Sequence, residues 1–235
     1  MPNRWGRQKK KERVCIMPGG QLFGQSRVIA ILWGILLLTS LTALVFGLWE
    51  LSFVAIATLA LAVAPAFLAS RLDISLPVPF VVATTIFIFA SVFMGELFDF
   101  YERVWWWDIA LHGASSIGFG LIGFLFVFML FEGDRYAAPP FAMAFIGFCV
   151  GVMVGTMWEV FEFAMDSWFG LNMQKTGLDD TMLDLIINAI GASLGAFAGF
   201  IYLRRRGNHW ISGLIEDFVA RNKRLYQKSR NRLGK

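Results

Sequence analysis

The chain has 235 residues, of which 57% are hydrophobic, and its mean hydropathy is +0.61. This composition is too apolar for a soluble domain and indicates a protein that crosses a membrane several times. The formal net charge is only +4, but the charged residues are distributed very unevenly along the chain.

Six segments are long and apolar enough to cross a bilayer as helices, which takes about 20 residues each. They are residues 28–48, 51–70, 78–98, 108–131, 139–163 and 181–203. We therefore predict an all-α polytopic membrane protein with six transmembrane helices. Its expected parts are a basic N-terminal arm (1–27), a membrane domain (28–203) and a basic tail (204–235). Cys149, in the middle of the fifth segment, is expected to be a small buried apolar residue.

The basic residues predict how the helices are oriented. Residues 1–27 contain seven Lys or Arg and residues 204–235 contain ten. With six spans, both ends of the chain lie on one side together with Arg71 and Arg135, which leaves only Arg103 and Lys175 on the other. The positive-inside rule makes the basic side cytoplasmic, so both termini are expected in the cytoplasm.

Three of the later segments combine a row of small residues with a group of polar residues. The small residues recur every four positions, so each row follows one helix face and permits close helix packing. The rows are Gly147, Gly151 and Gly155; Gly191, Gly195 and Gly199; and Ser116 with Gly120. The polar groups at the predicted outer ends are Asp108, His112, Glu159, Glu162, Asp166, Asp180, Asp184 and Asn188. Because charge inside a membrane is costly, these groups are expected to face a shared interior and to form a functional site.

The types and spacing of these polar residues are typical of a metal site. Carboxylates and imidazoles three or four positions apart on facing helices ligate metals in helical bundles. The candidate ligands are Asp108, His112, Glu159, Glu162, Asp180 and Asp184, with Asn188 and Asp166 in support. They suit a divalent metal such as Mg²⁺, Mn²⁺, Ca²⁺ or Zn²⁺, and the sequence does not choose among these. So many acids cannot all stay ionised at close range unless a cation binds or some of them are protonated.

Three functions are compatible with these residues. The first is a metal-dependent hydrolase or transferase acting on an envelope or lipid-linked substrate, with His112, Glu159 and Asp184 as candidate catalytic groups. The second is a membrane scaffold or partner-binding subunit whose acids form a structural network. The third is a small proton- or cation-coupled transporter.

The C-terminal tail predicts a different kind of contact. Trp210, Leu214 and Phe218 form an apolar stripe, and a basic segment follows it. This pattern indicates an amphipathic helix on the cytoplasmic membrane surface, where anionic lipids bind basic residues. We expect no nucleic acid partner, because the orientation rule already accounts for the basic residues. Besides the bilayer itself, a partner protein or a second copy of the chain remains a candidate partner.

Three motifs together carry a resemblance to a known family. They are Trp107-Asp108-x-x-x-His112, Trp158-Glu159-x-x-Glu162 and Asp180-Thr181-x-x-Asp184-x-x-x-Asn188-x-x-Gly191-x-x-x-Gly195. This combination, over residues 95–203, resembles the YjdF family of bacterial inner-membrane proteins. It is more distantly similar to VanZ-like proteins, which usually have a basic residue where Ile109 stands here. The resemblance implies a multi-pass protein of the bacterial inner (cytoplasmic) membrane with an envelope-facing site, and it implies no particular reaction.

Overall fold

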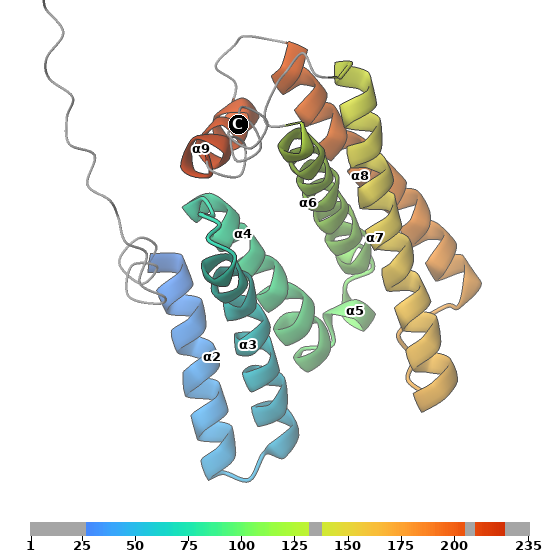
Figure 1. Cartoon of the computed structure of the whole chain (residues 1–235). Helices are drawn as coiled ribbons and strands as arrows, with labels where there is room; N and C mark the ends of the chain where they lie inside the picture. The colour runs from blue at the N-terminus through green and yellow to red at the C-terminus, as the bar shows by residue number, and fades with distance from the viewer. Residues whose placement is uncertain (1–26, 132–137, 205–209, 224–235) are drawn as a thin grey trace, which may run out of the picture.

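A computed structural model describes residues 27–131, 138–204 and 210–223 of the chain (Figure 1). Within these ranges the secondary structure is entirely helical. Six helices are long and apolar enough to cross a membrane, which confirms the predicted fold class. They are α2 (Arg27–Val45), α3 (Trp49–Arg71), α4 (Val78–Ile88) continued by η1 (Phe89–Glu96), α6 (Trp107–Leu130), α7 (Pro140–Phe169) and α8 (Leu178–Arg204).

The spanning helices form two groups. Figure 1 shows α2, α3 and α4 together on one side and α6, α7 and α8 together on the other. The short helix α5 (Phe100–Arg103) connects the two groups at one end of the molecule, and α9 (Trp210–Arg221) lies at the opposite end, where α4 begins. We call the end that carries Asp108, Glu162 and Asp184 the acidic end.

The rows of small residues hold α6, α7 and α8 together. A Cβ atom added to Gly123 would lie 2.8 Å from the carbonyl oxygen of Gly147, so α6 and α7 meet backbone to backbone. A Cβ atom on Gly191 would likewise lie 2.8 Å from the carbonyl oxygen of Gly113, which joins α8 to α6. Such close approach gains van der Waals contact between helices in lipid, where no hydrophobic effect drives them together. The predicted close packing is confirmed, and it brings the three polar segments to one place.

Cys149 lies on the face of α7 that is opposite to Gly147 and Gly151. Its side chain is exposed, so the prediction that it is buried was wrong. A residue two positions from Gly147 and from Gly151 points to the opposite face of a helix, because each position turns the helix by about 100°. The small residues face α6 and α8, and Cys149 therefore faces away from the bundle.

The third span changes its helical type as it approaches the acidic end. Residues Phe89–Glu96 form a π-helix, whose wider turns are rare and are frequent at functional sites. Gly95 lies in this segment directly against the ring of Tyr101 from α5, and a Cβ atom there would overlap that ring. The π-helix and the missing side chain together bring α5 close to the end of the third span.

A hydrophobic cluster fills the end of α6–α8 that is opposite to the acids. Phe124, Phe128, Met143 and Tyr202 are buried there, and Ile215 of α9 packs into the same cluster. A helix is therefore present in the tail, and Ile215, Phe218 and Val219 of this helix pack against the protein. The predicted contact of the tail with anionic lipids stays a prediction, because the chain beyond residue 223 is outside the described residues.

Candidate functional site

Three helices deliver polar side chains to one buried cluster at the acidic end. The contributors are Asp108 and His112 from α6, Glu159 and Glu162 from α7, and Asp184 and Asn188 from α8. Most of these residues are almost completely enclosed: His112 is 8% exposed, Glu159 3% and Asp184 2%. The extension of α7 to Phe169 is what surrounds Glu159 and Glu162 with further helical turns.

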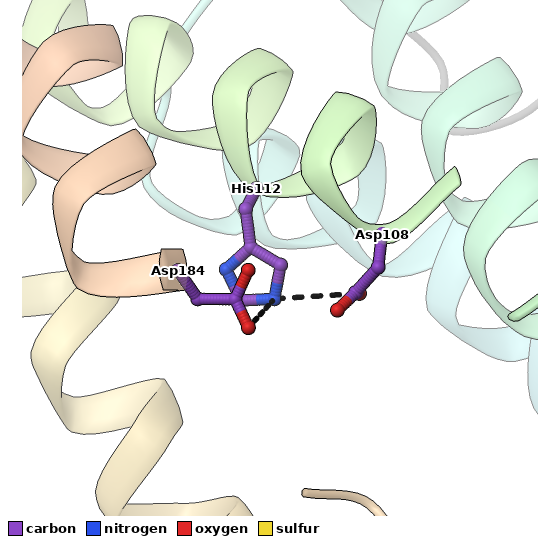
Figure 2. A group of neighbouring side chains, drawn as sticks. All are labelled: Asp108, His112 and Asp184. Carbon is purple, nitrogen blue, oxygen red and sulfur yellow. Dashed lines mark ion pairs between the residues drawn. The ribbon is translucent and has the colours of Figure 1, made fainter. Parts of the chain in front are cut away.

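His112 lies at the centre of the cluster. Its Nε2 atom is 3.6 Å from Asp108 Oδ1 and 3.9 Å from Asp184 Oδ2, as Figure 2 shows. Its Nδ1 atom is 3.5 Å from Glu159 Oε1. Three carboxylates from three helices therefore surround the two nitrogens of one imidazole. These separations are longer than ordinary hydrogen bonds.

Several buried oxygens of the cluster have no hydrogen-bond donor within the described residues. They are both carboxylate oxygens of Glu159 and the Oδ2 atom of Asp184. Buried polar atoms are nearly always paired, and an unpaired buried carboxylate is especially costly. The described side chains thus present a set of oxygens that suits a positively charged or proton-donating guest.

The geometry offers two groupings of ligand atoms that could hold a metal ion. One consists of Asp108, His112 and Asp184, and the other of His112, Glu159 and Glu162. Within each group the ligand atoms lie within 4.8 Å of one another. Metal bonds to such ligands are about 2.0–2.2 Å long, so small side-chain movements would bring either group into coordination. His112 belongs to both groups, and its two nitrogens face different carboxylates: Nε2 faces Asp108 and Asp184, and Nδ1 faces Glu159.

Glu162 and Asn188 have partners of their own. The indole Nε1 of Trp158, one helical turn earlier on α7, donates a 2.8 Å hydrogen bond to Glu162 Oε1. Ser116 Oγ donates a 2.5 Å hydrogen bond to Asn188 Oδ1 and so joins α6 to α8. The Nδ2 atom of Asn188 is buried and, within the described part of the chain, has no acceptor.

Besides Asn188, two of the predicted residues, both acids, are not part of either metal grouping. Asp166 accepts hydrogen bonds from the backbone N–H groups of Met173 (2.7 Å) and Gln174 (2.8 Å), so it fixes the loop after α7. Asp180 is partly buried at the start of α8 and belongs to neither of the two groups found among the described residues. The structure therefore gathers Asp108, His112, Glu159, Glu162, Asp184 and Asn188, and leaves Asp166 and Asp180 beside them.

A cavity of about 940 Å³ opens next to the cluster, between the two groups of helices. Asp108, His112, Glu162 and Asn188 line it from one side. Phe87, Ser91 and Val92 of α4 and η1 line it from the other. Its volume lies at the upper end of the range of small-molecule sites, which measure about 300–1,000 Å³. These four residues of the cluster are therefore accessible to a sizeable ligand, whereas Glu159 and Asp184 do not line the cavity.

The cavity also contains residues that the sequence reasoning did not select. Lys175 and Tyr101 line it, and the Nζ atom of Lys175 lies 5.8 Å from the centre of the Tyr101 ring. Burial, together with the smaller effect of the nearby acids Asp108, Glu96 and Glu162, raises the pKa of Tyr101 to about 12. The one available signal was that Lys175 is one of two basic residues on the acidic side. No sequence pattern pointed to Tyr101.

Comparison with known proteins places the chain in a family. The profile of the family described as "Predicted membrane protein (DUF2238)" matches residues 26–205, and the chain belongs to that family. An uncharacterized protein of Thermotoga maritima is 34% identical over 129 residues. That match covers 53% of this chain and 64% of the relative, so the chain spans less than two thirds of the relative's length. No solved structure matches the chain.

Proposed function

We propose that the cluster binds a divalent cation and that the protein is a metal-dependent hydrolase or transferase acting on an envelope or lipid-linked substrate. The main support is the burial of Glu159 and Asp184 with three carboxylate oxygens that lack hydrogen-bond donors among the described residues. A bound cation would offset the cost of burying these charges. Carboxylate and imidazole ligands suit Mg²⁺, Mn²⁺, Ca²⁺ or Zn²⁺.

The contacts of His112 suggest which residues hold the cation. Nε2 faces Asp108 and Asp184, so these three side chains are the proposed ligands. Nδ1 faces Glu159, which, like Asp184, is almost fully buried and does not line the cavity, but which lies against the other nitrogen of the ring. Histidine ligands commonly donate their second N–H group to a carboxylate, which fixes the ring and strengthens the metal bond. Glu159 is therefore proposed as the residue that orients His112.

Glu162 is the proposed general base, because it lines the cavity and is held at Oε1 by Trp158. It would take a proton from a water molecule or from an acceptor hydroxyl group. The oxygen of that water or hydroxyl group would bond to an electrophilic phosphorus or carbonyl carbon of the substrate, as the bond from this atom to the leaving oxygen breaks. The leaving oxygen would then take up the proton that Glu162 had accepted. The cation would supply stabilisation of the negative charge that develops on the substrate oxygen.

The surroundings of the site support a substrate that is reached from within the membrane. The cavity lies beside spanning helices, and its walls include apolar side chains such as Val92, Phe119 and Val154. The charge asymmetry favours an acidic end that faces outward from the cytoplasm. The likeness to YjdF-type proteins favours the bacterial inner membrane, and an envelope substrate suits that location.

The metal content of the purified protein tests the first half of this proposal. Elemental mass spectrometry of the wild type should show close to one divalent ion per chain. His112→Ala and Asp184→Asn should lose it, whereas Glu50→Gln, an acid of α3 outside the cluster, should retain it. Absence of bound metal in the wild type, with no uptake of added Mg²⁺, Mn²⁺, Ca²⁺ or Zn²⁺, would contradict the proposal.

Turnover tests the second half. The metal-loaded protein is incubated with lipid-linked phosphate esters and carboxylic esters, and head-group release or transfer is followed by chromatography. Glu162→Gln should keep the metal and lose activity, because glutamine cannot accept the proton. Loss of metal in Glu162→Gln would instead make this residue a ligand, and unchanged turnover would exclude it as the base.

A structural network is the main alternative. The hydrogen bond between Ser116 and Asn188, which links α6 to α8 beside the cluster, is the kind of contact that such a network requires. This alternative expects Asp184→Asn to keep both stability and function, since asparagine preserves shape and hydrogen bonding. A transporter is less well supported, because the hydrophobic cluster around Phe124 and Phe128 fills the opposite end of the same three helices.

A further inference from the structure

We propose that the cavity binds a membrane amphiphile with a phosphate head group, and that Lys175 and Asn188 donate hydrogen bonds to that phosphate. This inference rests on the proposed function, because a bound cation is needed to offset the surrounding acids. It adds the substrate class and two residues that recognise it.

Lys175 supplies positive charge to the cavity. Among the described residues that line it, Lys175 is the only Lys or Arg, and its side chain is 32% exposed. Its Nζ atom lies 3.0 Å from Glu102 Oε1, and the Glu102 side chain is 61% exposed. Exposed ion pairs contribute little to stability, so Lys175 can exchange Glu102 for a ligand at little cost.

The loop that carries Lys175 is held in a defined position. Gly170 ends α7 with a φ of 66°, and Asp166 accepts the backbone N–H groups of Met173 and Gln174. The side chain of Gln174 in turn donates a 2.6 Å hydrogen bond to Thr181 Oγ1 at the start of α8. These contacts on both sides of the loop fix the backbone from which Lys175 reaches the cavity.

Asn188 is an independent sign of a ligand with acceptor oxygens. It lines the cavity, it is 1% exposed, and its Oδ1 atom is already paired with Ser116. Its Nδ2 atom has no acceptor among the described residues. Gly155 leaves room for this amide, because a Cβ atom at that position would lie 2.7 Å from Nδ2. A phosphate oxygen in the cavity would satisfy the buried donor.

The remaining walls suit a hydrocarbon chain. Phe87, Val92, Phe119, Val154 and Met157 line the cavity from both groups of helices. A free phosphate ion would leave these surfaces without a partner, whereas the acyl or prenyl chain of a lipid would cover them. The donors Lys175 and Asn188 among the lining residues, together with these apolar walls, therefore point to a lipid phosphate.

Acids and aromatic rings near the cavity would also suit a cationic amphiphile, so the choice depends on charge. A divalent cation held by Asp108, His112 and Asp184 would make the cavity favour an anionic ligand over a cationic one, as bound metal ions commonly do. Lys175 adds a further positive charge. A cationic ligand would leave Lys175 and Asn188 Nδ2 without a role. A phosphate monoester accounts for both donors.

Binding to the purified protein in detergent tests the inference, with and without the divalent ion that the protein retains. The probes are short-chain phosphatidic acid, short-chain phosphatidylcholine, inorganic phosphate and an alkyl-trimethylammonium ion, and the readout is the shift in melting temperature as each is titrated. Phosphatidic acid with metal should bind at least tenfold more tightly than the other three.

Substitutions identify the residues involved. Lys175→Ala should weaken phosphatidic acid binding about tenfold, which is the usual size of one charge-assisted hydrogen bond. Lys175→Arg should retain most of the affinity, and Glu102→Gln should increase it by removing a competitor. Arg103→Ala is the matched control, because Arg103 pairs with Asp99 on the same side. Its binding should equal that of the wild type.

The outcomes separate this inference from the proposed function. Equal binding of phosphatidic acid by the wild type and by Lys175→Ala, or preferred binding of the trimethylammonium probe, would overturn the inference while leaving a measured metal content intact. Preferred binding of inorganic phosphate would overturn the lipid as its source. If instead the protein holds no metal and still binds phosphatidic acid through Lys175, the metal-dependent function and the need for a cation both fail, while the lipid phosphate and the role of Lys175 stand.

Discussion

Glu159 Oε1 lies 3.5 Å from His112 Nδ1, on the far side of the imidazole from Asp108 and Asp184. Glu159 is 3% exposed and approaches His112 from a different helix. The pair therefore couples the orientation of a side chain on α6 to the packing of α7. A site built in this way depends on the fold of the whole three-helix group.

Glu159→Gln should weaken metal binding without removing it. Glutamine keeps the size of the side chain but not its charge, so His112 becomes a weaker ligand. Changes in groups that support a metal ligand typically cost about 10–100-fold in affinity. A competition titration with a metal-sensitive dye measures the effect. Glu50→Gln, outside the cluster, is the control, and unchanged affinity in Glu159→Gln would show that Glu159 does not orient His112.

Gly195→Ala should destabilise the protein, whereas Gly118→Ala should not. A Cβ atom on Gly195 would overlap the carbonyl oxygen of Ile117, and on Gly118 it would meet nothing within 4 Å. Overpacking of a close contact costs about 1–3 kcal/mol. Thermal unfolding in detergent should show a lower midpoint for Gly195→Ala only. Equal midpoints for the two variants would mean that α6 and α8 lie farther apart than described.

Asn222→Ala should release α9 from the loop between α3 and α4. Asn222 Nδ2 donates to the carbonyl of Ser75 (2.8 Å), and Asn222 Oδ1 accepts from the Ser75 N–H group (2.6 Å). Removing these partners leaves polar backbone atoms unpaired, at a cost of about 1–3 kcal/mol. Hydrogen exchange should become faster in the α3–α4 loop and in α9. Arg221→Ala, which removes an exposed ion pair with Asp217, should leave exchange in the loop unchanged.

Tyr101 should titrate at unusually high pH. Its pKa of about 12 in the folded protein exceeds the ordinary value of 10.0, chiefly because of burial. Between these pH values the unfolded chain loses the phenolic proton and the folded protein keeps it, so the free energy of unfolding falls as pH rises. The difference in ultraviolet absorbance between wild type and Tyr101→Phe should have its midpoint near pH 12. A midpoint near pH 10 would indicate an exposed phenol.

The six spans could be predicted from the sequence because length and apolar composition determine whether a helix can cross a bilayer. The rows of small residues also predicted close packing, since their four-residue spacing marks a single face of a helix. Close packing of these faces predicts that Asp108, His112, Glu159 and Asp184 lie in one shared interior. The boundary of α7 was less predictable, because polar residues within its last turns resemble the end of a span.

Only the tertiary structure decided how these residues meet. Sequence spacing relates positions within one helix, whereas the two nitrogens of His112 face carboxylates from two further helices. The tertiary structure also distinguishes Asp166 from the acids around His112. Asp166 accepts hydrogen bonds from a loop, although it lies at the same end of the spans as the other acids. Lys175 lies in a loop and Tyr101 in a short helix, and both line the cavity because contacts with distant segments position these elements. Patterns along the sequence therefore determined the helices and their faces, and packing between helices determined the site.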